Sequence, residues 1–143
     1  MQLHASCAAR DGHGVLLLGP SGCGKSDLLL RLLDRGFALV ADDRVEVEDG
    51  VARVPAALAG LVEVRGLGIL RLPHQATARL ALAVELAPGS GSGGARLPDP
   101  TREPRSGLPS IALDPWPASA PLRVSLALDC ALGRVPQVAG AFT

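Results

Sequence analysis

One eight-residue segment has the residue types and the spacing needed to bind a polyphosphate. Gly19, Gly24, Lys25 and Ser26 satisfy the pattern G-x-x-x-x-G-K-[ST]. Glycines let main-chain amides turn toward an anion, the lysine ammonium reaches the terminal phosphates, and the serine hydroxyl is a ligand for Mg²⁺. The predicted nucleotide-binding residues are Gly19, Pro20, Ser21, Gly22, Cys23, Gly24, Lys25 and Ser26. The pattern therefore predicts a site for a nucleoside triphosphate with Mg²⁺.

The segments on either side of this loop are those that a phosphate-binding loop needs. Residues 14–18 form a short apolar run that is typical of a buried strand. Residues 26–35 place four leucines on one helical face, and Gly36 follows where helices commonly end. The alternative is a chance match in a chain with 17 glycines, and the flanking strand and helix argue against it. Lys25 is also the only lysine, beside 13 arginines, and its compact ammonium suits a phosphate.

Two adjacent carboxylates follow the next apolar segment. Residues 38–41 are predicted to form a buried strand, and Asp42 and Asp43 come directly after it. Carboxylates at the end of a strand beside a phosphate-loop strand lie next to the bound triphosphate. There they can hold Mg²⁺ or accept a proton from an attacking hydroxyl. The alternative is a solvated turn, which aspartate also favours. We interpret the pair as functional because the phosphate loop precedes it.

Other titratable residues carry weak signals by themselves. His4 lies in an apolar N-terminal segment, where a lone histidine is usually a packed or surface residue. Glu63 and Arg65 are two residues apart, so a strand would place them on one face as an ordinary charge pair.

The remaining segments indicate an α/β fold and one domain over residues 1–143. Asp49-Gly50 between two alternating segments predicts a hairpin turn, so the sheet must contain antiparallel pairs and is expected to be mixed. The other predictions are strands at 1–9, 44–48, 51–54, 61–65, 67–72 and 80–85, a helix at 122–132, a flexible loop at 87–109 and a loose tail at 133–143.

Composition argues against several classes of protein. The 14 basic and 14 acidic side chains give zero net charge, whereas nucleic-acid binders usually have a basic excess. No apolar run approaches the roughly 20 residues that span a bilayer. Charged residues at 10 and 11 interrupt the N-terminal segment, which argues against a signal peptide. The three cysteines have neither disulfide-framework nor zinc-site spacing. We expect a cytoplasmic protein that binds neither nucleic acid nor membrane.

Four segments in order make the chain resemble the catalytic domain of HPr kinase/phosphorylase, the bacterial enzyme that phosphorylates a serine of the phosphocarrier protein HPr. His4 stands 15 residues before Gly19, and the loop at 19–26 is followed by Val-Ala-Asp-Asp-Arg-Val at 40–45. Residues 63–69, Glu-Val-Arg-Gly-Leu-Gly-Ile, match a signature of this family. The resemblance covers residues 1–86. Within the family, the chain is similar to the short form that lacks the N-terminal regulatory domain.

The resemblance implies a protein-serine kinase that uses ATP and Mg²⁺. Lys25 would hold phosphate, while Ser26 and Glu63 would hold Mg²⁺. Asp43 would be the general base toward the serine hydroxyl, with Asp42 beside it.

Further expectations follow from the same family. His4 would assist in the site, and Arg96, in Arg-Leu-Pro, is the candidate for the family's catalytic arginine. The family implies a phosphoenolpyruvate-carboxykinase-like P-loop kinase core, an HPr-like partner and a homo-oligomer, which is a hexamer in the family. Two alternatives stay open: a P-loop kinase for a small molecule, and an ATP-binding regulatory module without transfer. Phosphorolysis also stays open, because residues 113–118 replace the family's Pro-Val-x-Pro-Gly-Arg-Asn segment.

Overall fold

The computed structural model describes residues 1–90 and 96–143. The elements in chain order are β1 (Gln2–Leu3), β2 (Ala5–Arg10), β3 (His13–Leu18), α1 (Lys25–Leu33), β4 (Ala38–Ala41), β5 (Val45–Glu48), β6 (Val51–Arg53), the 3-10 helix η1 (Ala56–Leu58), β7 (Leu61–Val64), β8 (Gly68–Arg71), β9 (Thr77–Leu86), β10 (Thr101–Arg102), β11 (Pro109–Leu113) and α2 (Ala120–Ala131). Among the described helices, none is long and apolar enough to cross a membrane.

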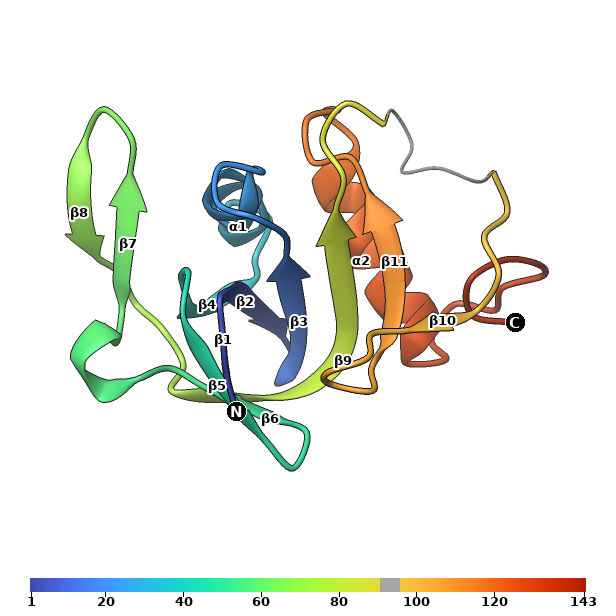
Figure 1. Cartoon of the computed structure of the whole chain (residues 1–143), viewed down its shortest axis with the longest axis horizontal. Coiled ribbons are helices and arrows are strands. Elements are labelled where there is room, and N and C mark those ends of the chain that lie inside the picture. The colour runs from blue at the N-terminus through green and yellow to red at the C-terminus, as the bar shows by residue number, and fades with distance from the viewer. Residues whose placement is uncertain (91–95) are drawn as a thin grey trace.

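One large mixed sheet organises the chain. Its strands follow the order β1-β5-β6-β9-β3-β2-β4, and β11 pairs with β9 and β10 with β11. β3 and β9 are parallel, as are β9 and β11, whereas β2 is antiparallel to both β3 and β4. The predicted α/β fold with a mixed sheet is therefore confirmed. β7 and β8 form a second, two-stranded sheet that stands apart from the large sheet in Figure 1.

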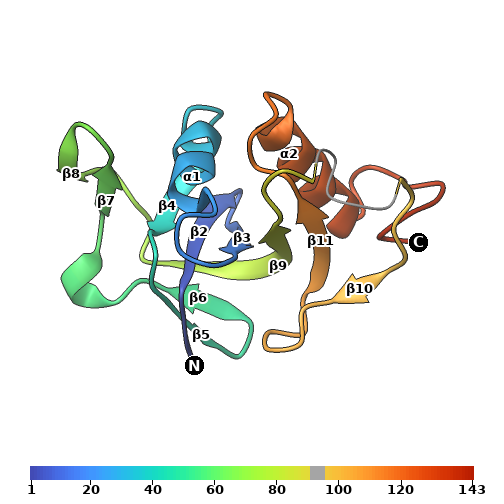
Figure 2. The ribbon, with the colours of Figure 1, turned by 45° about the horizontal axis from the view of Figure 1, so that its top comes forward.

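The two helices lie side by side on one face of the large sheet, as Figures 1 and 2 show. α1 buries Leu28, Leu29 and Leu32 there, and α2 buries Val124 and Leu128. Each such side chain contributes about 1.5–3 kcal/mol of apolar transfer free energy. The other face of the sheet has a second core, into which β1, β5 and β6 contribute Leu3, Val45, Val47 and Ala52. The sheet is covered on both faces, which fixes the position of its strand ends.

The structure corrects several segment predictions. The expected strand at 1–9 is split at His4, which separates β1 from β2. β11 begins at Pro109 and was missed, because its five residues follow a Pro-rich stretch and pair in parallel with a strand over 20 residues earlier. β10 lies within the expected loop at 87–109, of which residues 91–95 lie outside the described residues.

One further prediction is wrong. Arg65 lies in the turn between β7 and β8, so it is not on a strand with Glu63. Residues 133–143 have no helix or strand, and at their end Ala141 is buried and Phe142 packs against the core. The Phe142 amide also donates to Oε1 of Gln137 at 2.7 Å.

Candidate nucleotide-binding site

Strand direction brings distant parts of the chain to one edge of the large sheet. β3, β4, β9 and β11 all run the same way, so their carboxyl ends share this edge, and β2, which runs oppositely, begins there. The phosphate loop follows β3, the two aspartates follow β4, and residues 114–119 follow β11. Ligands of open α/β sheets bind at the carboxyl ends of the strands. The topology thus assembles the site from segments up to 100 residues apart in the chain.

The loop at 19–26 is closed around the lysine ammonium. Nζ of Lys25 donates to the carbonyl oxygens of Gly19 at 2.6 Å and Pro20 at 3.1 Å. The Lys25 residue is only 6% exposed, although its side chain carries a charge. Gly19 has φ 147°, and a Cβ there would lie 2.6 Å from Sγ of Cys23, so the loop requires glycine at this position. α1 begins at Lys25 and directs its free N-terminal amides toward the same loop.

Asp42 joins the loop to the end of β4. The hydroxyl of Ser26 donates to Oδ1 of Asp42 at 2.8 Å. Oδ2 of the same carboxylate accepts the amide of Glu63 at 3.4 Å, so Asp42 also connects the core to β7. These contacts fix one carboxylate beside the loop hydroxyl.

Ser6 is a site residue that the sequence interpretation missed. Ser6 is fully buried near the start of β2, the strand between β3 and β4. Its hydroxyl donates to Oδ1 of Asp42 at 3.1 Å and accepts the amide of Asp43 at 3.2 Å. A polar residue inside an otherwise apolar strand needs a hydrogen-bond partner, and that signal was present in the sequence.

Asp43 differs from Asp42 in both backbone and exposure. It has φ 68°, the left-handed region that costs a non-glycine residue free energy, and it is exposed. The Ser6 hydroxyl bond to its amide supports this conformation. The two neighbouring carboxylates are thus positioned differently, one bonded inward and one turned toward solvent at the cavity.

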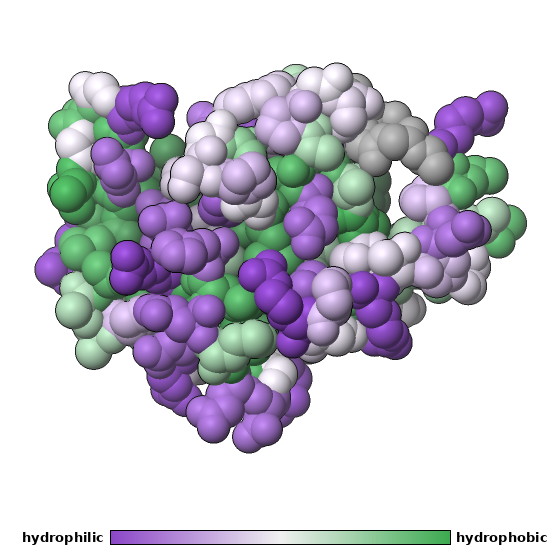
Figure 3. Space-filling view, viewed as in Figure 1, coloured by the Kyte–Doolittle hydropathy of each residue, from purple (hydrophilic) through white to green (hydrophobic). Residues whose placement is uncertain are grey.

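The two-stranded sheet of β7 and β8, hereafter the β7–β8 arm, supplies Glu63. This exposed residue lies on β7, opposite Ile69 on β8. Val62 of the arm is buried, whereas Leu67 and Ile69 at its far end are 70% and 72% exposed. Figure 3 shows hydrophobic surface on this arm, at the left of the view.

A cavity of about 480 Å³ lies between these segments. It is lined by Ser21, Gly22, Gly24, Lys25, Ser26, Asp27, Leu30, Asp42, Asp43, Glu63, Val64, Arg65 and Trp116. Four of these side chains are carboxylates and two are cations. The cavity therefore combines an anion-binding loop with a net negative lining.

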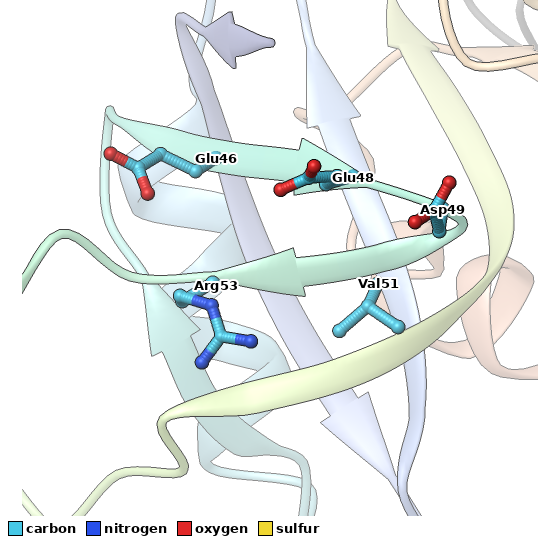
Figure 4. Close-up of a pocket in the computed structure, with 5 residues that line it drawn as sticks. All are labelled: Glu46, Glu48, Asp49, Val51 and Arg53. Atoms are coloured by element: carbon cyan, nitrogen blue, oxygen red, sulfur yellow. The ribbon is translucent and has the colours of Figure 1, made fainter.

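A second cavity, of about 260 Å³, lies on the β5–β6 hairpin (Figure 4). Glu46 and Glu48 on β5, Asp49 in the turn, and Val51 and Arg53 on β6 line it. Its lining has no residue of the 19–26 loop, so this cavity lacks the main-chain amides and the ammonium that would bind a polyphosphate.

Two predicted catalytic residues are not brought to the cavity of about 480 Å³, and Gly19, Pro20 and Cys23 of the loop are also outside its lining. Within the described part of the chain, its lining includes neither His4 nor Arg96. His4 is exposed between β1 and β2, and Arg96 is exposed beside the residues that the structure does not describe. Of the predicted site residues with side-chain chemistry, those brought to it are Lys25, Ser26, Asp42, Asp43 and Glu63.

Comparisons with known proteins show the family of this chain. Residues 1–78, more than half of the chain, match the family model described as HPr Serine kinase C-terminal domain. The HPr kinase/phosphorylase of Clostridium novyi (strain NT) is 48% identical over 66 residues, which are 43% of this chain and 22% of that protein. The HPr kinase/phosphorylase of Limosilactobacillus reuteri (strain DSM 20016) is 45% identical over 73 residues, 48% of this chain and 23% of that protein.

A solved structure matches almost the whole chain. The HPr(Ser) kinase/phosphatase from Coxiella burnetii has a TM-score of 0.77 and 25% identity, covering 94% of this chain and 92% of that chain. The chain spans less than a quarter of the length of the two curated relatives. The matched residues 1–78 hold the phosphate loop, both aspartates and Glu63. The chain therefore belongs to the HPr serine kinase C-terminal domain family.

Proposed function

We propose that this chain transfers the γ-phosphoryl group of ATP to a serine hydroxyl of an HPr-like phosphocarrier protein. The observation that carries this proposal is the bond from the Ser26 hydroxyl to Asp42, which sets the phosphate loop against a carboxylate at the end of β4. Phosphoryl transfer needs positioning and charge neutralisation more than covalent chemistry. A loop, a hydroxyl and a carboxylate held together supply both.

The charges around the cavity favour a nucleotide that arrives with a divalent cation. The lining has four carboxylates and two cations, so a bare triphosphate would meet net repulsion. Among the described residues there is no cluster of three or more His, Cys, Asp or Glu side chains that could hold a metal by themselves. Mg²⁺ is usually bound through one or two carboxylates, waters and substrate phosphates, so this donor set fits it.

The donors that would hold Mg²⁺ are Ser26, Asp42 and Glu63. Ser26 and Asp42 are already in contact, and the Glu63 amide contacts Asp42. When bound, Mg²⁺ would neutralise charge on the β- and γ-phosphates. Lys25 would exchange its bonds to the Gly19 and Pro20 carbonyls for phosphate oxygens, which are the stronger partners for an ammonium.

Asp43 is the residue we assign as general base. It is exposed at the cavity, where an incoming serine hydroxyl can reach it, whereas Asp42 is bonded to Ser6 and Ser26. Its carboxylate would accept the hydroxyl proton as the serine oxygen attacks the γ-phosphorus. In phosphorolysis the same group would return that proton to the serine oxygen while inorganic phosphate takes the phosphoryl group. His4 and Arg96 stay predicted catalytic residues.

An exposed rim supports a protein acceptor over a small molecule. The exposed lining residues are Ser21, Gly22, Asp27, Asp43, Glu63, Arg65 and Trp116. A small-molecule kinase encloses its acceptor to exclude water, whereas a folded protein must approach an open edge. We also propose a cytoplasmic location, as expected from the sequence, and a homo-oligomer, which the resemblance implies; sedimentation of the purified chain tests the oligomeric state.

The test is incubation of an HPr-type protein with this chain and Mg·ATP, followed by mass spectrometry. We expect one added phosphate on a serine, which Lys25→Ala should not produce and Asp43→Asn should produce far more slowly. Phospho-HPr with inorganic phosphate and Mg²⁺ tests the reverse reaction, which should yield pyrophosphate. ATP binding without transfer to any acceptor would favour a regulatory module, and transfer to a small molecule alone would favour that second kinase class.

A further inference from the structure

Trp116 is an aromatic side chain at the cavity that the phosphate chemistry does not use. It is the only tryptophan of the chain, is 53% exposed, and lines the same cavity as Lys25 and Ser26. It follows β11, whereas Glu63 lies on β7, and Figure 2 shows these two strands on opposite sides of α1. Trp116 and Glu63 therefore come to the cavity from separate elements.

The backbone around Trp116 is held in place. Its amide donates to Oδ1 of Asp114 at 3.1 Å, which forms a local turn. The carbonyl oxygen of buried Pro115 accepts a hydrogen bond from Nη2 of Arg31 on α1, and Arg31 also pairs with Asp27 at 2.9 Å. Prolines on both sides of Trp116 restrict its backbone further. The ring is therefore positioned before any ligand arrives.

The indole touches the phosphate loop itself. A Cβ built on Gly24 would lie 3.1 Å from Cη2 of Trp116 and 3.2 Å from Cγ of Pro115. Gly24 also has φ 101°, a backbone conformation that favours glycine, and a side chain there would be tight against the ring. The ring thus starts at the loop that would hold the phosphates and extends outward with about half of its surface free.

We propose that Trp116 is the base-contacting wall of the nucleotide site and that its indole stacks on the nucleobase. This rests on the proposed function, because it concerns the same ligand. The loop, Lys25 and the carboxylates match the triphosphate and its cation, which leaves the planar base as the part that an indole face complements. Stacking tolerates different bases, because every base has a π-face. The site is expected to accept ATP and GTP with similar affinity.

Intrinsic fluorescence tests this directly, because the chain has one tryptophan and no tyrosine. We expect Mg·ATP and Mg·GTP to quench the emission, and tripolyphosphate with Mg²⁺, which has no base, to leave it nearly unchanged. Calorimetry should show that Trp116→Ala weakens ATP binding about 5- to 30-fold while its tripolyphosphate affinity stays near that of the unmodified chain. Trp116→Phe should keep most of the affinity. Leu126→Ala, at a 47% exposed position of α2 outside the cavity lining, is the control and should change neither.

The outcomes separate this inference from the proposed function. Loss of ATP and tripolyphosphate affinity by the same factor in Trp116→Ala would overturn it, because the ring would then support the loop and not the base. Unchanged ATP affinity in that variant would also overturn it, with the nucleotide site intact. If the unmodified chain binds neither ATP nor tripolyphosphate, the proposed nucleotide site itself is refuted, and the proposed stacking is refuted with it.

Discussion

Replacement of Ser6 by alanine tests whether the buried hydroxyl positions the two aspartates. Ser6 Oγ donates to the Asp42 carboxylate and accepts the Asp43 amide. A hydrogen bond to a charged group contributes about 1.5–3 kcal/mol and a neutral one about 0.5–1.5 kcal/mol. Asp42 is only half-buried, so water replaces part of the first contribution. We take a loss near 2 kcal/mol in the free energy of unfolding, the low end of the sum.

Thermal denaturation followed by circular dichroism measures this loss. For a chain of this size, about 2 kcal/mol lowers Tm by roughly 4–8 °C. Cys7→Ala is the matched stability control, because Cys7 is the next residue of β2, equally buried, and on the opposite face. Ser6→Thr keeps the hydroxyl and should restore much of the loss.

The second readout is the Mg²⁺ concentration that gives half-maximal phosphotransfer. Without Ser6 Oγ, Asp42 loses one of its donors, so its orientation toward Ser26 relaxes and the half-saturating concentration should rise several-fold in Ser6→Ala. Cys7→Ala should leave that concentration unchanged even where it lowers Tm. Equal Mg²⁺ dependence in the two alanine variants would refute the positioning role and leave Ser6 as a packing residue.

Three further predictions concern the loop, the base and a thiol. Asp43→Asn should fold normally, because asparagine tolerates φ 68°. This variant should bind ATP but transfer phosphate at least about 100-fold more slowly. Near-normal turnover would remove the assignment of Asp43 as the base. Gly24→Ala should weaken nucleotide binding about tenfold or more, because backbone strain at this positive φ costs about 1–3 kcal/mol. Calorimetry that shows unchanged nucleotide affinity would contradict the tight loop geometry. Burial raises the pKa of the Cys7 thiol to about 12. Iodoacetamide at about pH 8 should therefore modify the partly exposed Cys130 and spare Cys7. Rapid labelling of Cys7 in the native protein would contradict its burial.

Local pattern was sufficient to predict the elements around the phosphate loop. The apolar run before Gly19, the leucine face after it and the hairpin at Asp49-Gly50 each depend on neighbouring residues, and the structure confirms all three. Asp42 does lie beside Ser26 at the carboxyl end of its strand, but the expectation that this strand adjoins the phosphate-loop strand is wrong, because β2 lies between β3 and β4.

Long-range pairing explains what the sequence did not predict. Ser6 contacts the aspartates because β2 lies between β3 and β4, an order that no local pattern specifies. Trp116 reaches Gly24 because β11 pairs with β9 in register, Leu113 beside Leu86. Spacing in the family's segments led to Arg96 and His4, and spacing alone does not say whether a side chain reaches the cavity.

The small size of the β7–β8 arm has a thermodynamic consequence for cation affinity. A two-stranded hairpin by itself is marginally stable. A cation shared by Glu63 and Ser26 would tie it to the domain, and the coupling is reciprocal: ion affinity and the arm's resistance to opening rise by the same factor. Any change that stiffens the turn at Gly66, which is outside the cavity lining, would then lower the ion's dissociation constant. Slower amide hydrogen exchange along β7 would report how much of the protein is loaded.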